Sequence, residues 1–387
     1  MKDDTKERRR RELIPRIALL ACLALVVASL GMALNPVSPK EPVAPPFSEQ
    51  ARSAALTETL RLRAAGEEIG PATAGSGQPA LTRTVSLLTS QARALLVPGQ
   101  DGTDRLPSPA PPPASPAAAP ASQPAAPLPA TAAALATELA ASASQRLADA
   151  AVADGGMARL LAAVGTAQLL QASSLAASVG APAPAVPDPA VPDPAAPALS
   201  GACPSAQASP SPAPAGAAAG ASGGASADAS ARQDSAATLP AALAATVQTE
   251  LVTVYGYQVA LTRVGGDVAA TASQQLARHE ALAGDAEALA RAHCVPVPPR
   301  EAGYAMAPAF LASPVAGLGR LEASAMAAYG DLVALSEGQT RQWAISGLVG
   351  AARRSALWGA ETGVLPGLPA DPDGFPELPA ASARPQP

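Results

Sequence analysis

Two glutamates, Glu250 and Glu322, occupy inward positions in otherwise apolar helical stripes in the last third of this 387-residue chain. A carboxylate costs several kcal/mol to bury unless a hydrogen-bond donor, a cation or a metal ion compensates its charge. A helix predicted between them carries His279 on its inner face, followed directly by Glu280. Carboxylates and imidazoles that converge from neighbouring helices are typical ligands of iron and manganese in helical proteins. These four residues are therefore the candidate metal ligands of the chain.

The ligand set of a paired metal site is nevertheless incomplete. A di-iron bundle takes one Glu from each of two helices and a Glu-x-x-His motif from each of the other two. Glu250 and Glu322 suit the first role, but Ala283 stands where the histidine should follow Glu280. The fourth helix offers cations where the motif needs a carboxylate and an imidazole: Arg341, Arg353 and Arg354.

The second interpretation of these glutamates is a closed network of ion pairs and hydrogen bonds. Glu250 and Glu322 would then pair with an arginine or with the hydroxyl groups of tyrosines in the same stripes, Tyr257 and Tyr329. The chain has two histidines, and about 21 Å of helix separates His279 from the other, too far for a shared metal. No Cys-x-x-Cys, His-Glu-x-x-His or phosphate-binding motif is present. We therefore expect a non-catalytic protein without a cofactor, and the alternative is a degenerate iron or manganese protein or oxidase.

Four helices must position these side chains. Apolar residues recur at alternating steps of four and three along 239–264, and a pair of glycines ends that helix. A second helix follows over 267–293, a third begins at Ser313-Pro314, and a fourth spans 339–359. Together they predict an all-α fold with a four-helix bundle over residues 235–369.

Several short motifs in this region occur in an order that carries a family resemblance. They are Glu250, Tyr255-Gly256-Tyr257, Tyr304-Ala305-Met306, Leu321-Glu322, Tyr329, Trp358 and Pro366-Gly367-Leu368-Pro369. With these motifs, residues 236–369 resemble the ferritin-like domain of exported actinobacterial proteins of unknown function. The resemblance implies a ferritin-like four-helix bundle and implies no particular activity.

The N-terminal end of the chain predicts a membrane segment. Basic residues are concentrated in residues 1–16, and an uncharged apolar run follows at 17–34. At a rise of about 1.5 Å per residue the run is about long enough to cross a bilayer, and the basic segment favours a cytoplasmic N-terminus. We expect either a single-pass anchor with an extracytoplasmic C-terminal part, or a cleaved signal peptide and a secreted protein. Lipidation at Cys22 is rejected because the apolar stretch before it is too short.

Proline, alanine, glycine and serine dominate long stretches of the chain, and aromatic residues make up only 2% of it. Such segments cannot bury enough apolar surface to offset the entropy of ordering them, which predicts disorder. The predicted divisions are a spacer with short helices and a Pro/Ala-rich linker at 35–129, a helical hairpin at 130–180, a disordered linker at 181–234 and a disordered tail at 370–387. The linker is either a tether or an insertion between two halves of one helical body.

Charge and cysteine content limit the partners of the chain. The net charge is −5, and no basic face with interleaved aromatics appears, which argues against nucleic acid. Cys203 and Cys294 either form a disulfide in an oxidising compartment or remain two thiols. We expect a membrane-tethered or secreted helical protein that contacts the membrane through residues 17–34, with an envelope protein as its candidate partner.

Overall fold

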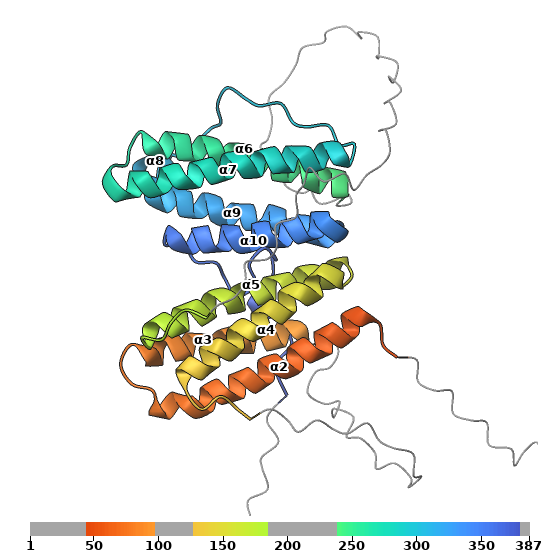
Figure 1. Ribbon diagram of the computed structural model, residues 1–387, viewed down its shortest axis with the longest axis vertical. Helices are drawn as coiled ribbons and strands as arrows, with labels where there is room; N and C mark the ends of the chain where they lie inside the picture. Colours follow the sequence, from red (N-terminus) through yellow and green to blue (C-terminus); the bar gives the residue numbers. More distant parts are fainter. Residues whose placement is uncertain (1–43, 97–126, 185–237, 380–387) are drawn as a thin grey trace, which may run out of the picture. The chain divides into compact units, whose positions relative to one another are not determined.

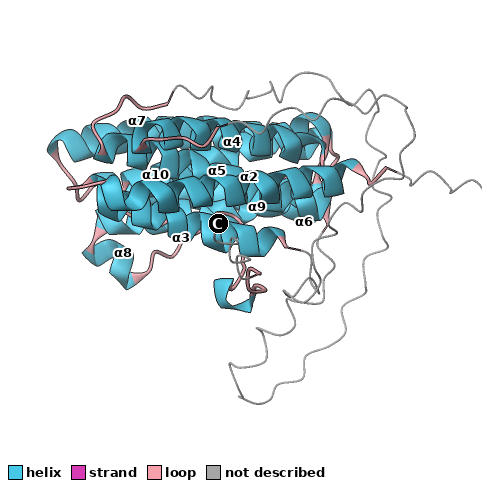
Figure 2. Ribbon diagram, turned by 90° about the horizontal axis from the view of Figure 1, so that it is seen from below, coloured by secondary structure: helices cyan, strands magenta, loops and turns pink. Residues whose placement is uncertain are grey.

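The computed structural model describes residues 44–96, 127–184 and 238–379 (Figure 1). These residues form helices, turns and irregular segments without any strand, so the predicted all-α class is confirmed for them (Figure 2). The basic segment 1–16, the apolar run 17–34, Cys203 and most of the 181–234 linker lie outside the described residues. All the helices given below belong to one compact unit that begins at Pro46.

The first part of the described chain forms what we call the N-terminal helices. They are α2 (Phe47–Ile69), α3 (Gly77–Leu95), α4 (Ala132–Val152) and α5 (Gly155–Ser178), with a short 3-10 turn (Gly70–Ala72) after α2. Helices α4 and α5 pack against each other, and both lie within residues 130–180. The hairpin turns at Ala153-Asp154, and the Asp154 carboxylate accepts a hydrogen bond from the backbone N–H of Met157 and caps the start of α5.

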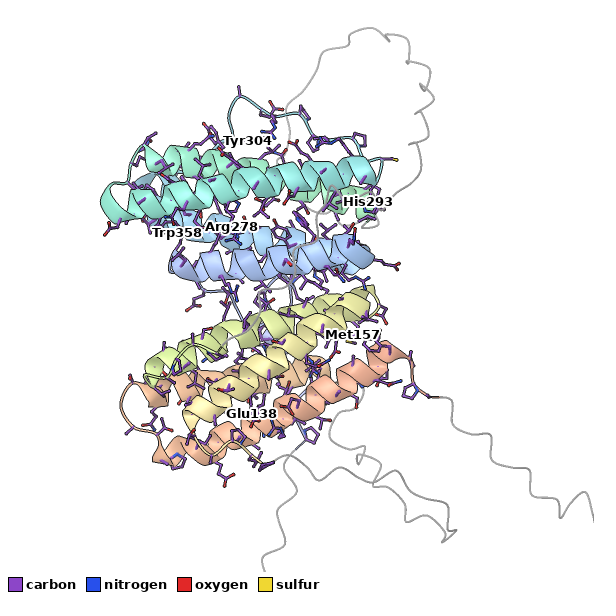
Figure 3. All side chains as sticks on the ribbon, viewed as in Figure 1. Glu138, Met157, Arg278, His293, Tyr304 and Trp358 are labelled. Atoms are coloured by element: carbon purple, nitrogen blue, oxygen red, sulfur yellow. The ribbon has the colours of Figure 1, made fainter. Side chains whose placement is uncertain are left out.

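The second part forms the C-terminal helices. They are α6 (Leu239–Leu261), α7 (Gly266–Ala292), α8 (Pro308–Ala312), α9 (Pro314–Leu335) and α10 (Gly338–Leu357). Helix α6 packs against α7 and α9, and α9 packs against α10. The short helix α8 lies in the connection between α7 and α9, and Tyr304 precedes it in the same connection (Figure 3). Proline in the first turn of α6 and of α9 is compatible with helix initiation, since it removes only an N–H that the helix leaves unbonded.

The two sets of helices share a hydrophobic core. Helices α4 and α5 pack against α10, and α5 also packs against α9. Buried residues of this core come from both sets and include Leu147, Leu161, Leu243, Leu289 and Trp343. The shared core favours the interpretation in which residues 181–234 connect two halves of one helical body.

Residues 360–379, which we call the C-terminal strap, contact the N-terminal helices. Leu365 and Phe375 pack with Val164 of α5, and the guanidinium of Arg93 donates hydrogen bonds to the carbonyl oxygens of Phe375 and Pro376. Arg159 donates two hydrogen bonds to the carbonyl of Gly367. The stretch 370–379 was predicted as the start of a disordered tail. These contacts hold it in place, and its proline-rich composition did not indicate them. The end of that tail, 380–387, lies outside the described residues.

Candidate functional site

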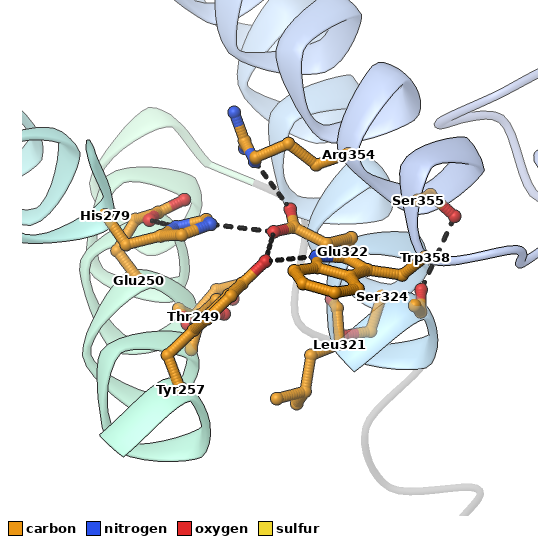
Figure 4. A network of polar contacts seen from close by, with 12 residues as sticks. Thr249, Glu250, Tyr257, His279, Leu321, Glu322, Ser324, Arg354, Ser355 and Trp358 are labelled. Carbon is orange, nitrogen blue, oxygen red and sulfur yellow. Dashed lines mark hydrogen bonds and ion pairs between the residues drawn. The ribbon is translucent and has the colours of Figure 1, made fainter. Parts of the chain in front are cut away.

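Three of the four predicted site residues meet in the interior of the C-terminal helices (Figure 4). Glu250 comes from α6, His279 from α7 and Glu322 from α9, and each side chain is 0% exposed. The helical stripes that contain them face one another, because α6 packs against both α7 and α9. The stripes predicted from the sequence therefore do bring these polar groups together.

The imidazole of His279 bridges the two carboxylates. Its Nδ1 atom lies 2.7 Å from Oε2 of Glu250, and its Nε2 atom lies 2.8 Å from Oε1 of Glu322. These nitrogens are separated by the Cε1 atom and their N–H directions diverge, so the two carboxylates approach the imidazole along different directions. Both distances are in the range of hydrogen bonds between ring N–H groups and carboxylate oxygens.

Two tyrosines and an arginine donate the remaining hydrogen bonds to the carboxylates. The hydroxyl of Tyr329 donates to Oε1 of Glu250 at 2.7 Å. The hydroxyl of Tyr257 donates to Oε1 of Glu322, also at 2.7 Å. The other oxygen of Glu322 accepts a hydrogen bond of 2.9 Å from Nε of Arg354 on α10. All four carboxylate oxygens are therefore occupied by donors or by His279.

Aromatic rings surround this polar network. The ring of Tyr257 stacks on the imidazole of His279 with centroids 5.1 Å apart, and the indole N–H of Trp358 donates a 2.7 Å hydrogen bond to the Tyr257 hydroxyl (Figure 4). Tyr329 packs against Trp343 with ring centroids 5.5 Å apart. The aromatic rings exclude water from the charges, so the hydrogen bonds form in a medium of low dielectric constant, where they are stronger than in water.

A glycine of helix α10, Gly347, leaves space for the ring of Tyr329. A Cβ atom at Gly347 would lie 2.0 Å from Cε1 of Tyr329, which is well inside any allowed contact. The absence of a side chain at Gly347 thus lets α10 approach α9 closely enough to cover Tyr329. This helix–helix contact holds the tyrosine hydroxyl against Glu250.

The pKa values of the site follow from burial and from these partners. Burial by itself lowers the pKa of His279, but the hydrogen bonds to Glu250 and Glu322 and their negative charges raise it above its ordinary value. Burial raises the pKa of Glu322, but the hydrogen bond from His279 and the charge of Arg354 bring it below the ordinary value. Burial, followed by the charge of the nearby glutamate, raises the pKa of Tyr257 and of Tyr329. At neutral pH both tyrosines therefore act as hydrogen-bond donors.

The arrangement does not fit a metal centre. In this arrangement a single ion cannot contact both carboxylates and the imidazole, because each ring nitrogen faces a different carboxylate oxygen at hydrogen-bond distance. Within the described ranges no group of three His, Cys, Asp or Glu side chains is arranged to hold a metal ion. Glu280 is not part of the cluster. Its side chain is exposed, because successive residues of a helix point about 100° apart and His279 faces inward.

The network interpretation of the sequence named most of the observed partners. Tyr257 follows Glu250 by seven residues, and Tyr329 follows Glu322 by seven, so each pair shares one helix face. The hydroxyls cross between helices, however, and each tyrosine binds the glutamate of the other helix. Sequence reasoning missed the bridging position of His279, whose signal was its place on the inner stripe of the intervening helix.

Two further residues differ from their sequence-based roles. Trp358, named from the sequence only as one of the family motifs, donates a hydrogen bond to the network through Tyr257. Arg341, one of the cations named on the fourth helix, lies away from the network and donates instead to the carbonyl oxygens of Ser336 and Ala153. It thereby links the start of α10 to the end of α4.

Comparison with known sequences finds one family. Residues 242–370 match the family described as Domain of unknown function (DUF4439), a ferritin-like type of domain. The match covers about a third of the chain, and it contains every residue of the buried network. Helices α2–α5 lie outside it. No curated protein and no solved structure matches the chain.

Proposed function

We propose that this protein is a non-catalytic helical protein that acts outside the cytoplasmic membrane, either tethered by residues 17–34 or secreted. Its C-terminal helices form a ferritin-like four-helix bundle whose interior serves stability rather than chemistry. The observation that carries the proposal is the saturation of the buried carboxylates, since every oxygen of Glu250 and Glu322 already has a partner from the chain itself. A substrate or a metal would have to displace these partners.

The burial of the network supports the same conclusion. Glu250, His279, Glu322 and Tyr329 have no exposed surface, and the aromatic shell separates them from solvent. Catalytic groups need access to a reacting atom within about 3 Å, and the polar partners of these groups all belong to the chain itself. The surface of the helices is then the part of the protein that remains for contact with an envelope partner.

The proposed location rests on the N-terminal sequence and on a disulfide. Cys294 is disulfide-bonded, and the other two cysteines of the chain lie outside the described residues. Disulfides persist in oxidising compartments outside the cytosol, which supports an extracytoplasmic protein. Within the described residues, α5 is long and apolar enough to cross a membrane, but most of it is buried in the protein, as expected of a core helix. The run at 17–34 therefore remains the proposed anchor.

The proposed function is tested by the metal content of the full-length chain purified in detergent without chelator and then offered ferrous iron or manganese. We expect no stoichiometric metal and an unchanged fold, as judged by circular dichroism. Near-stoichiometric iron or manganese that is lost in Glu250→Ala would instead show a degenerate ferritin-like metal protein. The Glu280→Ala variant is the matched control, because it removes an exposed carboxylate next to the same helix face.

A further inference from the structure

We propose that the surface formed by the start of α2 and the end of α4 binds a lipid bilayer through the side chains of Phe47 and Val152. This contact rests on the tethered form of the proposed function, in which residues 17–34 anchor the chain. The folded part of the chain would then touch the membrane directly, in addition to being attached to it.

Phe47 and Val152 both expose large apolar side chains to solvent. Val152, the last residue of α4, is 68% exposed, the highest value among the exposed large apolar side chains of the described residues. Phe47, the first residue of α2, is 45% exposed. Removing apolar surface from water is favourable, and aromatic and aliphatic side chains at the boundary of headgroups and acyl chains bind proteins to bilayers in this way.

A hydrogen bond holds these two residues at the same end of the helices. The hydroxyl oxygen of Ser48 accepts a 2.8 Å hydrogen bond from the backbone N–H of Asp154. Phe47 directly precedes Ser48, and Val152 lies two positions before Asp154. The start of α2 and the turn after α4 are therefore adjacent, and the two apolar side chains belong to one surface, which we call the α2–α4 end.

The chain itself keeps the α2–α4 end close to the bilayer. Residues 35–43 connect the proposed anchor to the first described residue, Ala44. Even fully extended, nine residues reach at most about 30–33 Å. The last part of the connection is stiff, because Pro45 and Pro46 precede Phe47 and a proline ring fixes its own φ angle. The start of α2 is thus the first folded part of the chain that can meet the membrane.

The charges near the α2–α4 end determine which lipids it can bind. Glu49 is partly exposed, and Asp154 and Glu337 are exposed. Arg52, by contrast, is buried and forms an ion pair with Glu49. Proteins that bind anionic lipids use clusters of lysine and arginine, and carboxylates would be repelled by the same lipids. The contact is therefore apolar, and it suits the neutral phospholipids of a bilayer.

The test uses the full-length chain reconstituted into vesicles of phosphatidylcholine that carries bromine on its acyl chains. Bromine quenches tryptophan fluorescence on contact, so Val152→Trp and Phe47→Trp report whether the α2–α4 end enters the bilayer. The native tryptophans, Trp343 and Trp358, are buried, and the wild-type chain gives their contribution. Circular dichroism checks that each variant is folded.

Leu357→Trp is the matched control, because Leu357 is also exposed, at 54%, but lies far from the α2–α4 end. Arg341, near the start of α10, donates to the carbonyl of Ala153 beside Val152. Leu357 follows Arg341 by sixteen residues of the same helix, which is about 24 Å along the helix axis. A side chain that merely faces solvent should behave like this control.

We expect brominated lipid to quench the added fluorescence of Val152→Trp and of Phe47→Trp, and to leave that of Leu357→Trp unchanged. Replacing part of the phosphatidylcholine with anionic phosphatidylglycerol should not increase the quenching. If Val152→Trp does not fold, the result for Phe47→Trp decides.

The other outcomes separate this contact from the proposed anchor. A chain that floats with the vesicles but shows no quenching at either position would overturn the lipid contact and leave the anchor intact; the α2–α4 end would then face a protein or solvent. Equal quenching of Val152→Trp and Leu357→Trp, or quenching that requires phosphatidylglycerol, would also contradict the proposal. A chain that does not float with the vesicles would overturn both the anchor and the lipid contact.

Discussion

The interiors of the N-terminal and C-terminal helices both contain polar side chains, but they join their helices by different interactions. In the N-terminal set, Ser142 of α4 donates to Gln168 of α5, and Gln168 donates to Gln91 of α3, at 2.9 and 3.0 Å. All three side chains are buried and neutral. In the C-terminal set, by contrast, the carboxyl groups of Glu250 and Glu322 link α6, α7, α9 and α10.

This difference decides how strongly each interior specifies its helix pairing. A neutral buried hydrogen bond contributes about 0.5–1.5 kcal/mol, whereas removing one partner of a buried ion pair costs about 3–5 kcal/mol. In the N-terminal set the buried ion pair, Arg146 with Asp149, lies within α4, and the ion pair that joins α2 to α4, Arg61 with Glu138, is partly exposed. The C-terminal helices therefore tolerate one arrangement of their charged groups, while the N-terminal helices depend mainly on packing of alanine and leucine.

The comparison is tested most severely by removing the central carboxylate. Glu322→Ala leaves Arg354 and His279 buried without their shared partner, so we expect the free energy of unfolding to fall by about 3–5 kcal/mol. Urea denaturation followed by circular dichroism measures this loss. The exposed Glu280→Ala should change the free energy by about 0.5 kcal/mol or less. Equal effects of the two substitutions would show that the network contributes no special stability.

The network makes the free energy of unfolding depend on pH on both the acidic and the alkaline side. The folded-state pKa of His279 is raised above its ordinary value of 6.5, so its contribution is complete below that pH and is lost as pH rises through the folded pKa. The pKa of Glu322 is lowered from 4.5, so its contribution is complete above that pH and is lost as pH falls through the folded pKa. The contributions of both groups to the free energy of unfolding are therefore complete between pH 4.5 and 6.5.

This dependence is measured as the difference in unfolding free energy between the wild type and His279→Gln at a series of pH values. We expect the difference to shrink on the alkaline side, because the wild type loses the imidazolium there and the variant has none to lose. A difference that stays constant through the alkaline range would mean that His279 does not exchange a proton on unfolding.

A smaller effect is expected from filling the space that α10 leaves for Tyr329. Gly347→Ala places a Cβ where it would be 2.0 Å from the Tyr329 ring, and overpacking of this kind costs about 1–3 kcal/mol. Gly284→Ala in α7 is the matched control, since nothing lies within 4 Å of a Cβ there and alanine favours the helix. It should be neutral or stabilising in the same thermal or chemical unfolding measurement. A loss of similar size in both variants would assign the effect to glycine in general.

The sequence predicted the helices and the inward positions of the polar residues, because apolar periodicity is a local property. It predicted the partners Tyr257 and Tyr329 for the same reason, since a spacing of seven returns to one helix face. It did not predict which tyrosine binds which glutamate, or that His279 lies between the carboxylates. These features depend on how far α6, α7 and α9 are shifted along their axes relative to one another, and the sequence of a single helix does not determine that shift. The strap was missed because its contacts join residues 282 and 283 positions apart.

The last two substitutions compare one hydrogen bond from each interior, and the smaller loss is expected in the N-terminal helices. Tyr329→Phe removes a donor to the carboxyl group of Glu250, and hydrogen bonds to charged groups contribute about 1.5–3 kcal/mol. Ser142→Ala removes a donor to the neutral amide of Gln168, and we expect a loss of about 0.5–1.5 kcal/mol. Both substitutions delete one hydroxyl from a buried position and leave the backbone unchanged, so the ratio of the two losses measures the effect of the charge. A loss from Ser142→Ala as large as that from Tyr329→Phe would show that burial, and not ionisation, determines how strongly these interiors hold their helices together.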